Sequence, residues 1–340
     1  MKKRLTAIYT GKMLNKKRDN KIIKINNNFH IKGLNLNKKG FIQISFTWLF
    51  AIIIGAIILF FAIYASVKLM KTEESVSSAE AGREISVLLN PLETGFGEEK
   101  TTPLTIPVES RLNNRCESFT GFGEQEISVS QKIRGKWTYA GVGSVTYNKY
   151  IFSNKSVQGK NFYLFSKPLE FPFKIADLIF LTSAEESYCF IDSPEKIQEE
   201  LTSLSQANLF TENCPSDSIK VCFEGGEDCV VAVDINDRTV EKDGSIVYFE
   251  TDSLMYGAVF SDKEIYECQV QRLMKRLKEL AFIYNDKENI ISVKGCPAEV
   301  NLLGLADSAS SLRDSSDLVV VKAAADDVED ENERAYCELW

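Results

Sequence analysis

Histidine is almost absent from this sequence, which holds one residue, His30, in 340 amino acids. A Ser-His-Asp triad, a Cys-His dyad and an imidazole-liganded zinc site all need histidine, so these sites are excluded from the rest of the chain. The sequence also lacks a CxxC pair, a P-loop and a GxGxxG motif. These absences argue against a zinc ribbon, a thioredoxin-like site and a nucleotide-binding fold. We therefore expect no enzymatic activity, no cofactor and no bound metal.

Charge is missing from one long stretch, because no Asp, Glu, Lys or Arg lies between Lys39 and Lys68. At about 1.5 Å per residue a helix of this length exceeds the thickness of a bilayer core. A secretory signal peptide cut on its far side is the alternative, but its apolar region is usually shorter. The sequence predicts a transmembrane helix over 41–67, with the lipid bilayer as its partner.

Positive charge gathers before this helix and negative charge after it. Residues 1–40 hold 12 of the 40 Lys and Arg residues but a single acidic residue, Asp19. Basic flanks are retained on the cytoplasmic face of a membrane. We expect a single-pass protein of the cell membrane, with a basic cytoplasmic leader over 1–40 and the acidic remainder outside. An acidic exterior lacks the cationic surface that phosphate contacts require, so nucleic acid is not expected as a partner.

Cysteine is missing from the first third of the chain. The chain has eight cysteines. Their even number and their place in the predicted exterior favour disulfides over the free thiols of a cytosolic domain. A two-residue turn at Gly225-Gly226 would place Cys222 opposite Cys229 in a hairpin, within disulfide reach. The candidates are Cys116, Cys189, Cys214, Cys222, Cys229, Cys268, Cys296 and Cys337.

The residues at the start of the uncharged stretch read KKGFIQIS, with Lys39, Gly40 and Phe41 at the centre. This junction resembles the processing site of class III signal peptides, the group of archaeal type IV pilins and archaellins. The resemblance implies cleavage between Gly40 and Phe41 by a prepilin-type peptidase. It also implies a helix whose inner half lies in lipid and whose outer half carries a head domain.

Helical signals continue beyond the membrane segment, over 68–90, before a region rich in Pro and Gly. The alternative to one long helix is a shorter membrane helix followed by a polar stalk. The region 91–125 is predicted to be an extended linker, and 126–340 an extracytoplasmic α+β domain. The fold class expected for the whole chain is α+β. A long N-terminal transmembrane helix is expected to precede a disulfide-containing ectodomain of mixed, mainly antiparallel β structure with a few packed helices.

Within this domain, runs of aromatic and β-branched residues predict strands. They lie over 126–182, on both sides of Gly225-Gly226, over 244–260 and at 318–321. Helices are predicted from Ser193-Pro194-Glu195 to about Ser205 and from Ala298 to about Leu312.

The strongest helix prediction outside the membrane segment starts at a capping box, Ser261-Asp262-Lys263-Glu264. Apolar residues at spacings of three and four predict one packed face, and the basic residues are expected mostly on the solvated side. The apolar positions are Tyr266, Val270, Leu273, Leu277, Leu280 and Tyr284, and the basic ones are Arg272, Lys275, Arg276 and Lys278.

Three shorter patterns receive plain interpretations. Residues 234–238 begin like a calcium loop but lack its later glycine and acid, which favours a turn at a strand end. The acidic run 326–333 is predicted to be a solvated loop. Asn154 begins an Asn-Lys-Ser sequon and is a candidate for N-glycosylation.

These observations favour a membrane-anchored surface protein, a pilin-like structural or assembly subunit without catalytic activity. Its expected partners are copies of itself or other pilin-like subunits. The alternative is a monomeric receptor or binding module held by an uncleaved signal anchor. An enzyme using a pair of carboxylates is the third hypothesis, which the sequence leaves without candidate residues.

Overall fold

The protein is described here from a computed structural model, which covers residues 46–88, 101–141, 143–223, 225–226 and 228–340, with the backbone alone over 70–88. The long helix and the head formed by residues 101–340 are described separately. The predicted processing residues Lys39, Gly40 and Phe41 lie outside the described residues.

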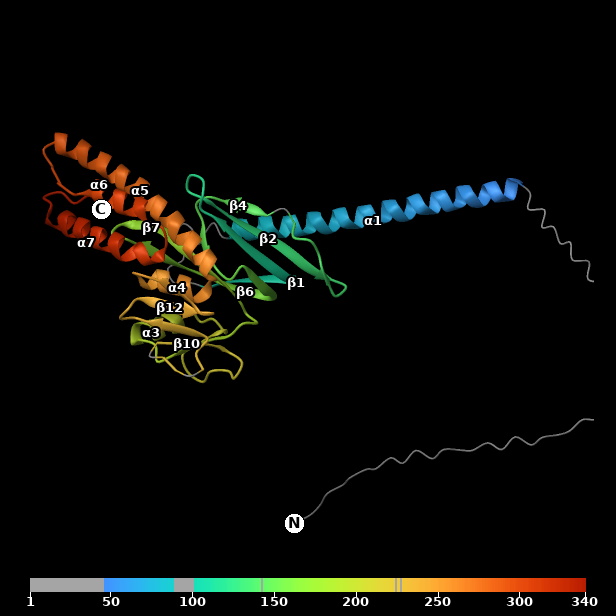
Figure 1. Cartoon of the computed structure of the whole chain (residues 1–340), viewed down its shortest axis with the longest axis horizontal. Coiled ribbons are helices and arrows are strands. Elements are labelled where there is room, and N and C mark those ends of the chain that lie inside the picture. Colours follow the sequence, from blue (N-terminus) through green and yellow to red (C-terminus); the bar gives the residue numbers. More distant parts are fainter. Residues whose placement is uncertain (1–45, 89–100, 142, 224, 227) are drawn as a thin grey trace, which may run out of the picture. The chain divides into compact units, whose positions relative to one another are not determined.

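The first element is α1 (Phe46–Leu88), a helix of 43 residues drawn in blue in Figure 1. The described residues of the predicted membrane segment and of its predicted continuation form this one unbroken helix. The part Phe46–Leu69 is long and apolar enough to cross a membrane, and none of it is buried. An apolar surface on all sides of a helix is typical of a segment that lies in lipid.

The head contains two β-sheets, and the first has seven strands in the order β3-β2-β1-β6-β7-β5, with β4 also paired to β2. Neighbouring strands are antiparallel except β5 and β7, which are parallel. The strands are β1 (Thr102–Glu117), β2 (Glu124–Ile133), β3 (Lys136–Trp137), β4 (Ser144–Thr146), β5 (Tyr150–Phe152), β6 (Ser156–Glu170) and β7 (Lys174–Ser183).

Strand β1 lies in the region predicted as a linker, 91–125. It pairs with β2 on one side and β6 on the other, so much of this region belongs to the sheet. Its register with β6 shifts between Thr105 and Ser110, around Pro107. A proline has no N–H to donate and fits a strand best at such a bulge. Its prolines point to a linker, but the alternating buried residues Leu104, Ile106 and Leu112 belong to a strand.

The second sheet has six strands in the order β13-β12-β11-β10-β8-β9. Four neighbouring strands, β9, β8, β10 and β11, run parallel to one another. Strands β11, β12 and β13 are joined as antiparallel hairpins. The head is therefore a mixed structure. The strands are β8 (Tyr188–Ile191), β9 (Leu209–Phe210), β10 (Ile219–Cys222), β11 (Val231–Asp234), β12 (Thr239–Lys242) and β13 (Ser245–Tyr248).

The predicted hairpin around Gly225-Gly226 is wrong, although the predicted disulfide Cys222–Cys229 is present. Strands β10 and β11 run parallel, with Val221 opposite Val231. The chain leaves β10 and returns to its starting end before β11 begins, so the disulfide closes a crossover loop. Two short apolar strands beside a Gly-Gly pair are compatible with either direction, and the neighbouring strands decide between them.

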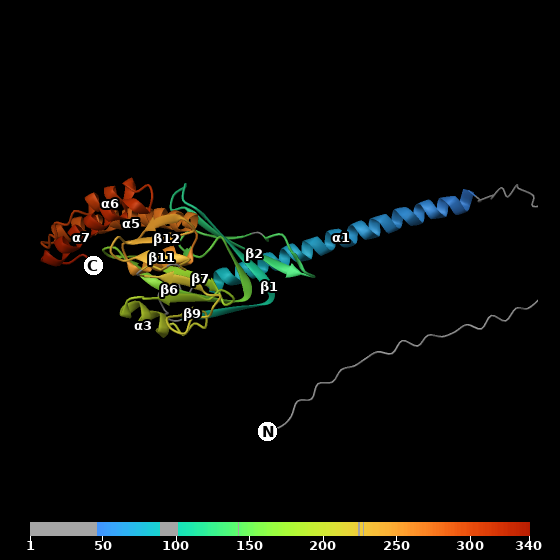
Figure 2. The ribbon, with the colours of Figure 1, turned by 60° about the horizontal axis from the view of Figure 1, so that its bottom comes forward.

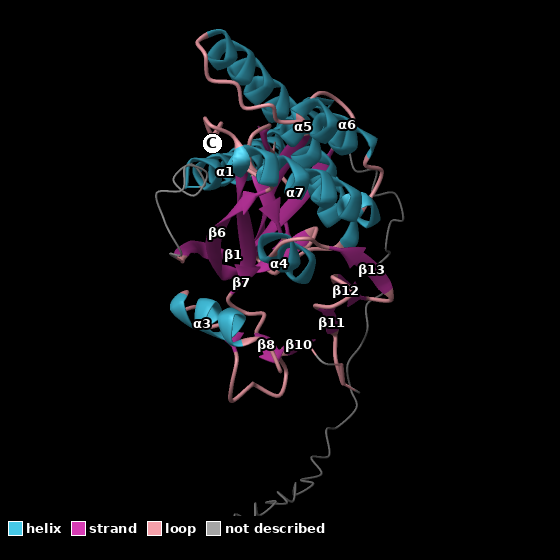
Figure 3. Ribbon diagram, turned by 90° about the vertical axis from the view of Figure 1, so that its left-hand side faces the viewer, coloured by secondary structure: helices cyan, strands magenta, loops and turns pink. Residues whose placement is uncertain are grey.

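Helices pack on and between the sheets (Figure 3). In the described part of the head they are α3 (Glu195–Ser203), α4 (Asp252–Phe260), α5 (Lys263–Val293), α6 (Leu302–Ser311), the 3-10 helix η1 (Ser315–Asp317) and α7 (Leu318–Arg334). Figure 2 shows α5, α6 and α7 gathered at the C-terminal side of the head. The predicted helices at 193–205 and 298–312 are confirmed as α3 and α6, each slightly shorter than expected.

Helix α4 replaces the strand predicted over the second half of 244–260. Its residues from Ser253 to Phe260 are all buried, against β5, β6 and β7 on one side and β12 and β13 on the other. Thr251 accepts a hydrogen bond from the Leu254 amide and caps the helix. A short apolar run bears no periodicity when every face is buried, so the sequence alone does not separate helix from strand here.

Helix α7 corrects two further predictions, the last strand at 318–321 and the solvated loop at 326–333. Its buried residues Leu318, Val321, Ala325 and Val328 follow one another at helical spacing. The run Val319-Val320-Val321 suggested a strand, but only one of these three residues is buried. The acidic residues lie on the side of the same helix that faces solvent, which is the amphipathic arrangement of a surface helix.

Helix α5 is confirmed, and so is its packed face. Tyr266, Val270, Leu273 and Leu277 are at most 1% exposed, and Leu280 and Tyr284 pack partly buried against the same core. The capping box is wrong in detail: Ser261 ends α4, and Asp262 caps α5 without a side-chain hydrogen bond. The turn predicted at 234–238 is confirmed, since the Asp234 carboxylate accepts from the amides of Asn236 and Asp237 between β11 and β12.

Candidate functional site

All eight cysteines of the head form disulfides, and no described cysteine is free. The pairs are Cys116–Cys268, Cys189–Cys214, Cys222–Cys229 and Cys296–Cys337, with Cα atoms 5.6 to 6.0 Å apart. The pair Cys116–Cys268 fastens β1 to α5, and the pair Cys296–Cys337 fastens the C-terminal tail to the loop after α5. The predicted disulfides are thus supported, and the structure supplies the three pairings that the sequence left open.

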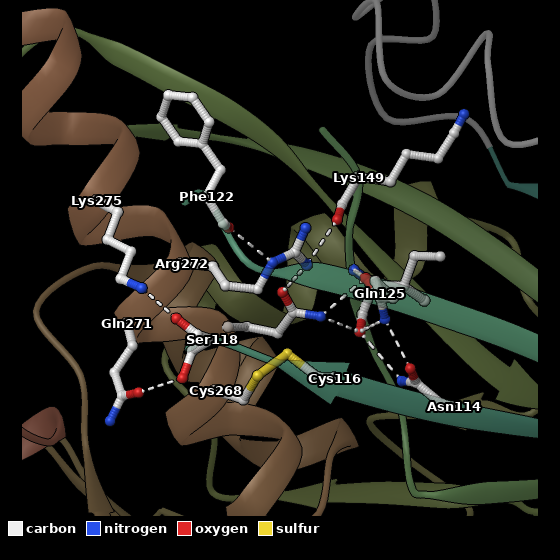
Figure 4. Close-up of a disulfide and its surroundings, with 12 residues drawn as sticks. Asn114, Cys116, Ser118, Phe122, Gln125, Lys149, Cys268, Gln271, Arg272 and Lys275 are labelled. Carbon is white, nitrogen blue, oxygen red and sulfur yellow. Dashed lines mark hydrogen bonds between the residues drawn. A yellow bond between two sulfur atoms is a disulfide. The ribbon is translucent and has the colours of Figure 1, made fainter. Parts of the chain in front are cut away.

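Arg272 lies beside the first of these disulfides and is completely buried (Figure 4). Its guanidinium donates to the carbonyls of Phe122, Tyr147 and Lys149 at 3.0 to 3.2 Å, and to Gln269 Oε1 at 2.8 Å. The central carbon of the guanidinium group, Cζ, also lies 4.9 Å from the centre of the Tyr150 ring. The prediction that the basic residues of α5 face solvent is therefore wrong for Arg272.

Burial lowers the pKa of Arg272 to about 10, and Tyr150 and Glu124 oppose this change. The side chain remains a cation at neutral pH, and its charge is stabilised by carbonyl dipoles. It holds the β1–β2 turn and the chain before β5 against α5. Two neighbours on α5 hold the same turn, because Lys275 donates to the Ser118 carbonyl and Gln271 accepts from the Ser118 hydroxyl (Figure 4).

A buried set of amide side chains continues from Arg272 into the first sheet. Gln125 of β2 accepts from the Ile151 amide at 2.8 Å and donates to the Ile151 carbonyl at 2.9 Å, as a neighbouring strand would do. Asn114 and Gln269 also donate to that carbonyl. Side chains thus bring β2 to the free edge of β5, and the sheet curls around a second core, which includes Leu112, Val129 and Ile179.

A second cation lies where the two sheets meet. Lys242, the last residue of β12, donates from Nζ to Asn154 Oδ1 at 2.9 Å and to the carbonyls of Val259 and Ser261 at 3.5 and 3.3 Å. The two carbonyls are at the C-terminal end of α4, where the helix dipole favours a positive charge. Lys242 also borders a cavity of about 180 Å³. The candidate glycosylation residue Asn154 is therefore half-buried and hydrogen-bonded.

The charges around Lys242 come from several elements. Burial lowers the pKa of Lys242, and the carboxyl groups of Asp262, Asp243 and Glu186 oppose that change. Burial raises the pKa of Glu186, which lies between β7 and β8, and Lys242 opposes that change. We call Lys242, Asn154, Glu186 and Asp262 the Lys242 cluster. Nothing in the sequence pointed to it, because its members lie far apart in the chain.

An open groove of about 850 Å³ lies along α3 and β9. Strand β9 is the edge of the second sheet. Gln206, at the side of this groove, is 6% exposed, and neither its amide oxygen nor its amide nitrogen has a hydrogen-bond partner. A buried amide without partners is costly, so a ligand that supplies a donor and an acceptor would be stabilised here.

Among the described residues, no group of three or more His, Cys, Asp or Glu side chains is placed to hold a metal ion. Comparison of the chain with family models, with curated proteins and with solved structures gave no match.

Proposed function

We propose that this chain is a membrane-anchored protein with an extracytoplasmic head, and that it acts as a pilin-like structural or assembly subunit. The apolar surface of α1 carries the proposal. Its segment Phe46–Leu69 is 24 residues long, is apolar enough to cross a membrane and has no buried residue. At about 1.5 Å per residue this segment reaches about 36 Å, which suits a bilayer core of about 30 Å.

The disulfides support an extracytoplasmic head. Structural disulfides persist in oxidising compartments and are rare where thiols are kept reduced. Four disulfides with none of the described cysteines left free agree with the orientation that the basic leader favours. The head would then be built and oxidised on the far side of the membrane from the N-terminus.

The length of α1 supports a pilin-like role over a simple anchor. The helix continues from Leu69 to Leu88 without a break, which adds about 29 Å beyond the apolar segment. A helix with a lipid-facing part and a polar extension can pack against the same helix of neighbouring subunits while each head stays outside. The junction at Gly40 and Phe41 would release the leader before such assembly.

Sequencing of the mature N-terminus tests this proposal. In cells with an active prepilin-type peptidase we expect the protein to begin at Phe41. Replacement of Gly40 by isoleucine should leave the leader attached, whereas the same change at Gly33 should not. An intact leader on the unaltered protein in such cells would contradict the proposal.

Assembly is tested separately by a photo-reactive amino acid at Ile57, in the apolar segment. A subunit that assembles through α1 should give crosslinked homo-oligomers or adducts with similar subunits in membranes. A matched probe at Val319, which is exposed on α7 of the head, should not give the same adducts. If neither probe gives crosslinked oligomers, the result would favour a single anchored module.

A binding module on an uncleaved signal anchor is the second candidate, and the groove along α3 and β9 favours it. An extended peptide could pair with the edge of β9 and satisfy the amide of Gln206. Replacement of Gln206 by leucine should then weaken capture of such a peptide without lowering the stability of the head. Equal binding by both proteins would contradict this reading of the groove.

A further inference from the structure

The contact between Lys242 and Asn154 brings an amine to a carboxamide inside a folded domain. The Lys242 Nζ atom lies 2.9 Å from Asn154 Oδ1. Since a carbonyl bond is about 1.2 Å long, Nζ lies within roughly 4 Å of the carbonyl carbon Cγ. Asn154 follows β5 of the first sheet and Lys242 ends β12 of the second, so the pair bridges the two sheets.

Neighbouring groups hold both the Lys242 amine and the loop that carries Asn154. The carbonyls of Val259 and Ser261 accept from the same Nζ atom, while Asn154 is next to Lys155, whose amide donates to Asp262 at 2.6 Å. A salt bridge of 3.1 Å between Lys155 and Glu264 fixes the same loop to α5. Both reacting groups are therefore restrained, which raises their effective concentration by several orders of magnitude.

Burial and the neighbouring charges act in opposite directions on the protonation state of Lys242. Burial lowers the pKa of Lys242, which makes the free amine more accessible. Burial raises the pKa of Glu186, which makes its carboxyl group better able to hold a proton. Asp262 and Asp243 are the other carboxyl groups acting on Lys242, and they oppose the first effect. Glu186 and Lys242 act on each other electrostatically, and a carboxyl group can carry a proton between two reacting groups.

We propose that Lys242 and Asn154 become joined by an intramolecular isopeptide bond. The lone pair of the free amine attacks Asn154 Cγ, and a bond forms between Nζ and Cγ. The bond between Cγ and Nδ2 breaks, and Nδ2 leaves as ammonia. Glu186 accepts the proton released from Nζ and passes it to the departing nitrogen. The carbon remains at the oxidation level of an amide, so no oxidant or reductant is needed.

The crosslink adds a covalent tie between the sheets that the four disulfides do not provide. Cys116–Cys268 joins the first sheet to α5, whereas Lys242 and Asn154 join the first sheet to the second. The bond also excludes N-glycosylation at Asn154, because a glycan would occupy the nitrogen that leaves. This inference concerns the head alone and does not depend on how α1 is used.

Mass spectrometry of the purified full-length protein tests the proposal. After reduction of the disulfides, the intact mass should be lower than the sequence mass by one ammonia molecule, once any leader cleavage is taken into account. Tryptic digestion of the denatured protein should give a branched peptide that joins residues 150–155 to residues 239–263, with Lys242 uncut. Separate linear peptides, with cleavage after Lys242, would overturn the proposal. A glycan on Asn154 would overturn it as well.

Matched variants identify the groups that react. Lys242→Arg and Asn154→Ala should each abolish the ammonia loss. Lys263→Arg alters another lysine beside the same cavity and should leave the loss of ammonia unchanged. Ser156→Ala removes the sequon but keeps both reacting groups, so it should also leave the loss of ammonia unchanged. Glu186→Gln should lower the crosslinked fraction several-fold, and an unchanged fraction would overturn the part assigned to Glu186. The unaltered protein alone decides whether the bond forms, so a variant that fails to fold does not affect that result.

Discussion

In α1, none of the described side chains from Phe46 to Leu69 is buried, whereas the head holds two hydrophobic cores, four disulfides and a completely buried arginine. The helix needs lipid or neighbouring helices to cover its apolar surface, because burial of that surface is the main source of stability for a helix. The head contains its own partners. Changes in α1 should therefore alter where the protein resides, and changes in the head should alter whether it stays folded.

The largest expected effect is the loss of the disulfide that spans most of the head. Cys116 and Cys268 are 152 residues apart, and Cys222 and Cys229 are 7 apart. From the loop-closure entropy of the unfolded chain, replacement of the first pair by serine should cost about 5 kcal/mol and of the second about 2.5 kcal/mol. Urea unfolding in detergent measures both. Equal losses would show that loop length does not govern these two bonds.

Replacement of Arg272 by methionine should cost about 3 to 5 kcal/mol, because it removes a buried cation and the hydrogen bonds that it donates to three carbonyls and to Gln269. Arg313 is the control, since its side chain is 85% exposed and makes one ion pair, with Asp317. Its replacement by methionine should change the unfolding free energy by less than about 1 kcal/mol. Similar costs at both positions would contradict the role given to burial.

A charge in the apolar segment should weaken membrane insertion and leave the stability of the head unchanged. Ile58→Arg places a cation near the middle of Phe46–Leu69 and should disfavour membrane insertion by about 2.5 to 3.5 kcal/mol. Ile58→Ala keeps the position apolar and should remain in the membrane fraction. Membrane fractionation measures the difference, and the urea midpoint of the head should be the same in both variants. A lowered midpoint in the arginine variant would break the separation between helix and head.

A smaller effect is expected at the β1–β2 turn. Gly123 has φ of +68°, and a Cβ atom there would lie 2.4 Å from the Glu117 carbonyl oxygen. Gly121, in the same turn, also has a positive φ, but a Cβ atom there would meet nothing within 4 Å. Gly123→Ala should cost about 2 to 3 kcal/mol, and Gly121→Ala about 1 kcal/mol. Thermal or urea unfolding compares them, and equal costs would leave crowding without a role.

The smallest effect concerns pH. Burial raises the pKa of Glu267, whose carboxyl accepts from the amide and hydroxyl of Ser315. The folded head therefore binds this proton more tightly than the unfolded chain, and its stability should fall as the pH rises above the ordinary value of 4.5. The loss is complete above the pKa of the folded state. Glu267→Gln should remove this part of the slope, and an unchanged slope would assign it to other groups.

The sequence predicted the features that depend on local pattern. The periodic apolar residues of α5 from Tyr266 to Tyr284 specified both the helix and its packed face. The uncharged stretch before Lys68 specified the apolar helix. The distribution of the cysteines indicated disulfides, because their number and positions relative to that helix can be read without a fold.

The failures share a physical cause. The runs at 254–260 and 318–321 are apolar enough for either a helix or a strand, and the elements packed around them decide which forms. The parallel direction of β10 and β11 depends on the neighbouring strand β8, whose Tyr188 pairs with Ile219 from a distant part of the chain. The prolines of β1 are typical of a linker, but its alternating apolar residues are buried in the sheet and make this segment a strand.

The sequence by itself determined which segment is apolar enough for lipid, which residues can form disulfides and which catalytic classes lack their residues. Tertiary structure alone decided how the other six cysteines pair, why Arg272 is buried and how Lys242 meets Asn154. These last features join residues from distant parts of the chain. Their energies arise from desolvation and hydrogen bonding in a particular packing arrangement, which neither the spacing nor the composition of a sequence contains.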